Sequence, residues 1–159
     1  MHWKTKAAIF RALSAIPLAD HIHYCLQRYV TREWPRPTQS LDQLLKAAQR
    51  IRSAAEGRRA RFLEIGAGRD LAIALSLRLL GGKHVTCVDI RRLARLPLIC
   101  HAATHLSKRI ETPAPALQSW EDLTAFGIDY VAPRRLHDAA TPRQSIDCFY
   151  SVDTLIQTH

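Results

Sequence analysis

The sequence has no long apolar segment, and no run approaches the roughly 18 to 20 residues that a membrane-spanning helix needs. It also lacks the pattern of a secretory signal, because Arg11 interrupts the apolar stretch near the start and no small-residue cleavage site follows. We therefore predict a cytoplasmic protein without a transmembrane segment. Its 159 residues, of which 47% are hydrophobic, suffice for one domain that buries a core.

The cysteines and histidines lack the spacing of a metal site. The four cysteines form no CxxC pair and no disulfide framework, and we predict reduced, mostly buried thiols, because free cysteine packs as a small apolar residue. His101 and His105 could share one helix face, but no third ligand accompanies them, so we predict no metal site. The cysteines are Cys25, Cys87, Cys100 and Cys148.

Acidic residues are scarce. Only 14 Asp and Glu stand against 23 Lys and Arg, which gives a formal net charge of +9 and favours anionic partners. The arginine clusters at residues 50–61 and 91–95 are not interleaved with aromatic side chains, as a platform for single-stranded nucleic acid would be. A solvated basic surface is the favoured interpretation. A non-catalytic basic module that binds nucleic acid or an anionic membrane is an alternative.

Apolar periodicity predicts helices alternating with strands after an N-terminal helical segment. Residues 4–33 have helical spacing broken near Pro17, and Ser40 begins the next helix, with Gln43 completing a capping box. Strands alternating with helices predict an α/β fold with a parallel sheet. The other predicted elements are strands at 61–65, 85–89, 128–132 and 145–150, helices at 70–80 and 97–110, and a short helix capped by Ser119 and Asp122.

The most informative segment, residues 62–70 (FLEIGAGRD), joins a strand to a helix. Gly66 and Gly68 let the chain turn tightly and let a ligand approach the backbone, while the following helix aims its free amides at that ligand. A dinucleotide site needs a third glycine where this chain has Leu71. Glu64 would repel a pyrophosphate and would suit a cationic amino group. An NAD-binding nucleotide fold is therefore a disfavoured alternative.

A second acid, Asp89, lies at the predicted end of the next strand. A carboxylate there can accept hydrogen bonds from two ribose hydroxyls, as in dinucleotide sites about 20 residues beyond their glycines. Ile90 follows and could pack on an adenine face. Taken singly, Glu64 could form a salt bridge and Asp89 could cap a helix, but their placement around the glycine turn favours one shared site.

These residues resemble the motifs of class I S-adenosylmethionine-dependent methyltransferases. Residues 64–68 (EIGAG) resemble the first motif, residues 88–90 (VDI) the second, and residues 145–155 the fourth strand with its following turn. The resemblance implies a three-layer Rossmann-like sandwich with a partial parallel sheet of order 3-2-1-4. It also implies an N-terminal helical extension or lid (1–38) and an incomplete cofactor-binding domain (39–159) that lacks the family's last strands.

By the same resemblance, the cofactor is S-adenosylmethionine and the function is methyl transfer to a small-molecule or anionic acceptor. Glu64 would orient the amino group of the cofactor, the glycine turn would lie under its methionine part, and Asp89 would hold its ribose. No catalytic residue is assigned, and activity of the incomplete domain is left open. The implied cofactor-binding residues are Glu64, Gly66, Ala67, Gly68, Asp89, Ile90 and, just past the fourth strand, Ser151.

The sequence departs from the family pattern at three places. Asp70 replaces a common third glycine and could narrow the loop or cap the helix. Residues 132–135 (APRR) have arginines where an acid often meets the adenine amino group, and the nearest acid is Asp138. Residues 155–157 (LIQ) stand where relatives often have Leu-Glu-His, so no catalytic role is transferred to them.

Overall fold

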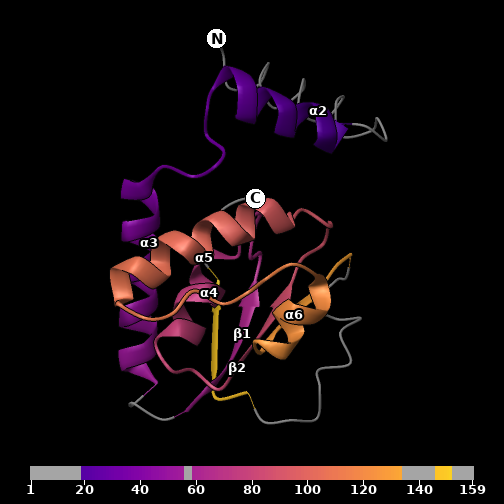
Figure 1. Cartoon of the computed structure of the whole chain (residues 1–159). Coiled ribbons are helices and arrows are strands. Elements are labelled where there is room, and N and C mark those ends of the chain that lie inside the picture. Colours follow the sequence, from indigo (N-terminus) through magenta and orange to yellow (C-terminus); the bar gives the residue numbers. More distant parts are fainter. Residues whose placement is uncertain (1–18, 56–58, 134–145, 152–159) are drawn as a thin grey trace, which may run out of the picture. The chain divides into compact units, whose positions relative to one another are not determined.

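The computed structural model describes residues 19–55, 59–133 and 146–151. The chain divides into two compact units, residues 1–35 and residues 36–159, and each unit is described by itself (Figure 1). In the described ranges, no helix combines the length and the apolar character that a bilayer crossing requires.

The first unit contains an α-helix, α2 (Ala19–Cys25), that continues into a π-helix, η1 (Leu26–Val30). These two elements confirm helical structure in the second half of the segment predicted over residues 4–33. After the helix, the Trp34 indole Nε1–H donates to Gln27 Oε1 at 3.2 Å. Gln27 therefore ties the helix to the segment that follows it.

The second unit is built on a four-stranded parallel sheet with the order β3-β2-β1-β4, which confirms the predicted α/β fold and strand order. The register places Phe62 beside Val85 and Val85 beside Ile128, and all three residues are at most 1% exposed. They form the buried face of the sheet. The strands are β1 (Arg61–Ile65), β2 (His84–Val88), β3 (Ile128–Val131) and β4 (Cys148–Ser151).

Helices α3 (Thr38–Ala54), α4 (Ala72–Leu79) and α5 (Leu96–Ile110) share one core with that face (Figure 1). α4 contacts both other helices, and residues 72–77 are all buried, which confirms a helix that is apolar nearly all round. The structure thus establishes helices packed on a parallel sheet. The crossover between β3 and β4, residues 134–145, lies outside the described residues.

The two predicted helix caps have different outcomes. Ser119 starts α6 (Trp120–Ala125) as predicted, because its hydroxyl accepts from the Asp122 amide at 3.1 Å and the Asp122 carboxylate accepts from the Ser119 amide at 2.9 Å. The box predicted at Ser40 is wrong. Pro37 is the N-cap residue of α3, and the Ser40 amide already donates to the Pro37 carbonyl at 3.0 Å inside the helix.

Arg78, near the end of α4, holds the turn that leads into β3. Its guanidinium Nε–H donates to the Phe126 carbonyl at 2.7 Å, and Nη1 donates to the carbonyls of Gly82 and Lys83. The guanidinium carbon also lies 5.2 Å from the centre of the Phe126 ring. Burial lowers the pKa of Arg78. One side chain therefore joins the α4–β2 connection to the α6–β3 turn.

We expect Arg78→Met to lower the free energy of unfolding by about 2–4 kcal/mol, because three backbone carbonyls lose a charged hydrogen-bond donor. Urea unfolding followed by circular dichroism measures the loss. Arg109→Met is the control, because the Arg109 side chain is 57% exposed and pairs with Asp42 at the surface. We expect the control to lose less than about 1 kcal/mol. Equal losses in the two variants would contradict the role of Arg78.

Candidate functional site

The loop between β1 and α4 is a tight glycine turn at the carboxyl end of β1. Gly66 and Gly68 both have a φ of 76°, a left-handed conformation that glycine adopts without steric cost. The Gly66 amide donates to the Val88 carbonyl at 2.9 Å, so the turn begins as an extension of the β1–β2 pairing. Among the described residues, no heavy atom lies within 4 Å of the place where a Gly68 Cβ would stand. The turn therefore leaves open space beside its backbone.

Asp89 is the first residue after β2, and the structure brings it to the glycine turn. Its carboxylate lies close enough to the Gly68 amide and the Tyr130 hydroxyl for both groups to lower its pKa, and the residue is 5% exposed. One carboxylate oxygen, Oδ2, is buried and has no hydrogen-bond partner among the residues that the structure describes. An unsatisfied buried oxygen costs about 1–3 kcal/mol, so Asp89 offers an acceptor to a ligand. It caps no α5 amide, since Arg95 is that helix's N-cap.

Glu64 lies on β1 and is 3% exposed. The strand register places it beside Cys87 of β2 and Tyr150 of β4. The Cys87 thiol donates to Glu64 Oε2 at 3.7 Å, while the Tyr150 hydroxyl approaches the carboxyl closely enough to lower its pKa without reaching hydrogen-bond geometry. Burial, with smaller contributions from the charges of Asp89 and Asp70, raises the pKa of Glu64 to about 7.

The electrostatics of the site favour a cation. Burial also raises the pKa of Asp89 to about 6, although the nearby Tyr130 hydroxyl and Gly68 amide act in the opposite direction. Glu64 and Asp89 therefore retain protons at pH values where an exposed carboxyl has lost them. A positive group bound between them would favour their ionised forms, whereas a pyrophosphate would be repelled.

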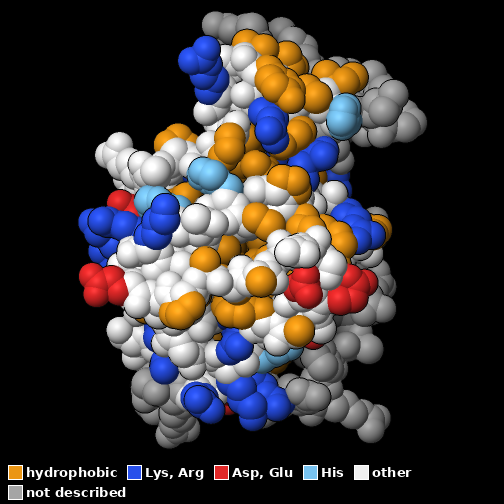
Figure 2. All heavy atoms as spheres, in the orientation of Figure 1, with side chains coloured by type: hydrophobic (Ala, Val, Ile, Leu, Met, Phe, Trp, Pro, Cys, Tyr) orange, Lys and Arg blue, Asp and Glu red, His pale blue; other side chains and the backbone are white. Residues whose placement is uncertain are grey.

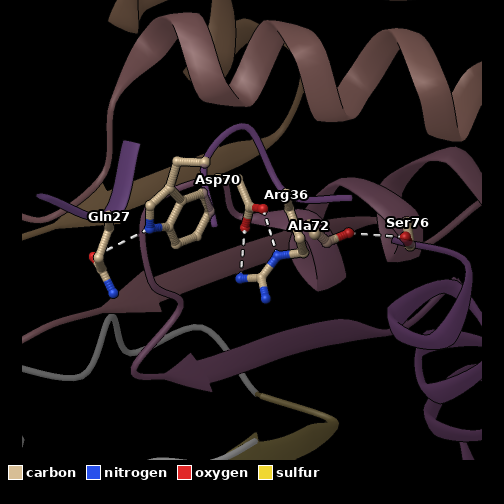
Figure 3. Close-up of polar contacts among 6 residues, drawn as sticks. Gln27, Arg36, Asp70, Ala72 and Ser76 are labelled. Atoms are coloured by element: carbon tan, nitrogen blue, oxygen red, sulfur yellow. Dashed lines mark hydrogen bonds and ion pairs between the residues drawn. The ribbon is translucent and has the colours of Figure 1, made fainter. Parts of the chain in front are cut away.

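Asp70, at the position of the third glycine, is paired with Arg36 (Figure 3). Arg36 Nε donates to Oδ2 at 2.7 Å and Nη2 donates to Oδ1 at 3.4 Å, and the Asp70 side chain is 3% exposed. Of the two alternatives given for Asp70, the helix cap is wrong, because Leu71, with a φ of 51°, is the N-cap residue of α4 and no side chain caps that end. Asp70 instead fastens the glycine turn to the residue that precedes Pro37 and α3.

We expect Arg36→Met to lower the free energy of unfolding by about 3–5 kcal/mol, because it leaves the buried Asp70 carboxylate without its ion partner. The double variant Arg36→Met/Asp70→Asn should recover a large part of that loss, since it also removes the buried charge. Thermal unfolding at pH 7 measures both values. If the double variant is no more stable than Arg36→Met, the ion pair does not have the energetic role that its burial implies.

The remaining predicted residues also lie at this end of the sheet. Ile90, directly after Asp89, is 70% exposed, which leaves an apolar side chain available to a flat ring, and Ala67 is 9% exposed within the turn. The placement predicted for Ser151 needs correction. It is the last residue of β4 rather than a residue past the strand, and its hydroxyl donates to the Ile65 carbonyl at 3.1 Å. Ser151 therefore supports the strand that carries the glycine turn.

Three further side chains, which the sequence interpretation did not include, surround the two acids. Cys87 and Tyr150 meet Glu64, and Tyr130 meets Asp89. Cys87 and Tyr150 lie on the two strands next to β1, which carries Glu64. Tyr130 lies on β3, next to the strand that precedes Asp89. The signal for the first two was present in the sequence, because a parallel register that pairs Glu64 with Cys87 brings their side chains to one face of the sheet.

Of the paired histidines, His105 lies beside a carboxylate. His105 Nε2 lies 3.0 Å from Asp42 Oδ1, and the described residues contain no cluster of three or more potential metal ligands. All four cysteines are free, as predicted, but only Cys87 is fully buried. The prediction of mostly buried thiols is therefore wrong for the other three, which are partly exposed.

Some predicted features lie outside the described residues, namely Pro17, Arg134, Arg135, Asp138 and residues 152–157. No family model, curated protein or solved structure matches the chain. Its function must therefore be inferred from the chemistry of the site itself.

Proposed function

We propose that the chain binds S-adenosylmethionine and belongs to an enzyme that transfers the methyl group to a small or anionic acceptor. The observation that carries this proposal is the buried Asp89 carboxylate. The Gly68 amide of the glycine turn lies close enough to lower its pKa, and its Oδ2 has no hydrogen-bond partner within the described ranges. Glu64, which interacts electrostatically with Asp89, supplies a second acid at the same end of the sheet.

The Asp89 carboxylate fits the two adjacent hydroxyls of a ribose. A carboxylate is an acceptor with two oxygens, and each can take a hydroxyl proton from a vicinal diol. Oδ2 is available without displacing a bond to a described residue. Ile90 is next in the chain and 70% exposed, so it offers apolar surface to a base. We assign Asp89 to the ribose and Ile90 to the adenine.

Charge separates S-adenosylmethionine from NAD as the ligand. S-adenosylmethionine has an ammonium group, a sulfonium group and one carboxylate, whereas NAD has a pyrophosphate. The Glu64 carboxyl is influenced by the charges of both Asp89 and Asp70, so carboxyl groups are concentrated here. A positively charged group would stabilise the ionised forms of Glu64 and Asp89, whereas a pyrophosphate would oppose them. We assign Glu64 to the amino group.

In this assignment, the residues of the chain bind and orient the reactant. The cofactor, when bound, supplies a methyl group on positively charged sulfur that is already activated for transfer. Asp89 and the turn at residues 66–68 hold the nucleoside end, and Glu64 holds the amino end. Fixing both ends aligns the methyl group with an acceptor, and alignment is a large part of the rate gain in such a reaction.

Isothermal titration calorimetry of the full chain with S-adenosylmethionine, S-adenosylhomocysteine and NAD tests the proposal. We expect saturable binding of the first two ligands and no measurable binding of NAD over the same concentrations. Asp129→Asn is a matched control, because Asp129 is a β3 carboxylate that pairs with His84 at 3.0 Å rather than with the glycine turn, and this variant should bind like the wild type. Binding of NAD, or no binding of either sulfur ligand, would overturn the proposal.

The first unit favours a second candidate function, attachment to an anionic membrane. Arg28 lies beside the apolar side chains of α2 and η1, with its guanidinium carbon 5.7 Å from the Tyr29 ring centre. Figure 2 shows hydrophobic side chains gathered on this part of the molecule, with Lys or Arg at their margin. An apolar stripe beside cations suits the surface of an anionic bilayer. The exposed apolar residues are Ile22 (44%), Leu26 (48%), Tyr29 (71%) and Val30 (70%).

We expect the full chain to sediment with phosphatidylglycerol vesicles and not with phosphatidylcholine vesicles, because both apolar burial and charge contribute to such binding. Leu26→Asp should reduce the bound fraction at least about fivefold, since it places a negative charge in the apolar stripe. Phe149→Ser is the control, because Phe149 is a similarly exposed apolar residue (53%) in the second unit. Equal effects of the two substitutions would exclude α2 and η1 as the membrane-binding segment.

A further inference from the structure

Arg92 is an exposed residue in the segment that joins β2 to α5. It comes three residues after Asp89 and two residues after Ile90, which is 70% exposed. Because each residue extends the chain by at most about 3.6 Å, the Arg92 Cα lies within about 7 Å of the Ile90 Cα. Arg92 therefore stands at the rim of the candidate site, beside the residue that we assign to the adenine.

An aromatic ring holds the guanidinium of Arg92. The guanidinium carbon lies over Trp120, 5.4 Å from the ring centre, and Trp120 stacks on Tyr130 with ring centres 5.7 Å apart and an interplanar angle of 19°. An aromatic face attracts the cation but accepts none of the in-plane N–H groups of the guanidinium. Within the described ranges, Arg92 forms no ion pair with a carboxylate, unlike Arg36 and Arg109. Its donors therefore remain available to an anion.

The backbone on both sides of Arg92 is also held in place. The Tyr130 hydroxyl accepts from the Leu93 amide at 3.0 Å and from the Ala94 amide at 3.2 Å, and it donates to the Arg91 carbonyl at 3.2 Å. One tyrosine therefore fixes the segment through its hydroxyl and supports the aromatic stack through its ring. An arginine with a fixed backbone and a stacked side chain loses less conformational freedom on binding than a solvated surface arginine does.

We propose that Arg92, stacked on Trp120, binds an oxyanion, either a carboxylate or a phosphate, at the rim of the candidate site. The planar guanidinium matches both groups, because it donates two parallel N–H bonds to a pair of oxygens. The identity of the ligand rests on the proposed function, in which the oxyanion belongs to the methyl acceptor, whereas the anion site itself does not. Since Arg92 lies beside the nucleoside end, that oxyanion is remote from the reacting atom, and its binding serves to align the acceptor.

An NMR titration of the full chain with inorganic phosphate, without cofactor and at constant ionic strength, tests the anion site. We expect saturable shifts of the Arg92 Nε–H and Trp120 indole N–H signals, with half-saturation at about 1–10 mM. Arg92→Gln should abolish the Trp120 shift, and Arg92→Lys, which keeps the charge but loses the planar fork, should weaken binding at least about fivefold. Arg50→Gln is the matched control, because it removes the same charge from an exposed position on α3, and it should leave the titration unchanged.

Acetate and a short single-stranded RNA, titrated in the same way, separate the sources of the oxyanion. A nucleic acid strand binds to a series of aromatic rings along a basic groove, whereas a single arginine stacked on a single tryptophan suits one oxyanion. We therefore expect acetate or phosphate to saturate the Arg92 signals, and the tighter of the two identifies the class of the acceptor. If the RNA saturates them at concentrations at least about 100-fold lower, with an affinity that falls steeply with salt, Arg92 belongs to a nucleic acid interface and the proposal is wrong.

Shifts that increase linearly with phosphate, or that persist at Trp120 in Arg92→Gln, would show an ordinary solvated charge and overturn the anion site. If phosphate saturates the Arg92 signals but the full chain binds no S-adenosylhomocysteine in calorimetry, the anion site stands and the proposed function fails. If S-adenosylhomocysteine binds and neither phosphate nor acetate saturates the signals, the cofactor site stands and the inference about Arg92 is wrong.

Discussion

Replacing Asp89 with alanine is expected to weaken S-adenosylmethionine binding by at least about 100-fold. The ribose would lose an ionised acceptor, and hydrogen bonds to charged groups are worth about 1.5–3 kcal/mol each. Two such bonds correspond to two or more factors of ten in affinity. Calorimetry at pH 8 measures the loss, since the wild-type carboxylate, with a pKa of about 6, is then ionised even without ligand.

Asp89→Asn refines the same experiment. The amide has a similar shape and keeps one acceptor oxygen, but it loses the charge and replaces the other oxygen with a donor. We therefore expect an intermediate loss, about 10-fold. An affinity for Asp89→Ala within about threefold of wild type would show that the carboxylate does not hold the ribose. In that case the unpartnered Oδ2 would need another explanation.

The fold could be predicted from the sequence because its signals agree with one another. The strand at residues 61–65 is followed by a glycine turn and then by a helix that is apolar nearly all round. Only a buried position between other layers of structure suits such a helix. Alternating strands and helices imply a parallel sheet with right-handed crossovers. The predicted strand order was implied by the family resemblance, and the structure has that order.

The start of α3 was mispredicted because two start signals lie close together. Ser40 and Gln43 match a capping box, but Pro37 has a φ of −58° and is already at the N-cap position, with α3 beginning at Thr38. The amide of Ser40 is then occupied by the Pro37 carbonyl. A local motif cannot reveal that the helix has already begun upstream of it.

Only those parts of the candidate site that depend on one segment of the sequence at a time could be predicted. The glycine turn and Asp89 follow from spacing and strand ends, and the structure brings the Gly68 amide close to the Asp89 carboxylate. The partner of Asp70 did not follow, because Arg36 lies 34 residues away and in a different local context. Tyr130 was also missed, since its interaction with Asp89 depends on how β2 and β3 align.

The raised pKa values of the two acids make the free protein sensitive to pH. Folding raises the pKa of Glu64 from an ordinary 4.5 to about 7 and that of Asp89 from 3.8 to about 6. The folded state therefore holds protons that the unfolded chain has released. Stability decreases with rising pH wherever the folded state binds more protons than the unfolded chain. The stability of the free protein should therefore decrease as pH rises from about 4 to about 7. Between pH 5 and pH 8 we expect a loss of about 3–4 kcal/mol from these two groups.

Glu64→Gln should remove the larger share of this loss. At pH 8 the variant is expected to be about 2–3 kcal/mol more stable than wild type, because it no longer buries an ionised carboxylate. At pH 5 the difference should nearly vanish, since Glu64 is then protonated in the folded state. Urea unfolding at both pH values, without ligand, measures the four free energies. A wild-type stability that rises from pH 5 to pH 8 would contradict the burial of these acids.

Glu64→Gln should also have opposite effects on stability and on ligand binding. A bound ammonium group would stabilise ionised Glu64, so ligand binding near pH 6.5 should release a proton, and the heat of binding should depend on the ionisation enthalpy of the buffer. Glu64→Gln removes that group and should abolish its share of the buffer dependence while weakening ligand affinity about 10-fold or more. A variant that is more stable at pH 8 yet binds as tightly as wild type would assign the buried acid to the core and not to the ligand.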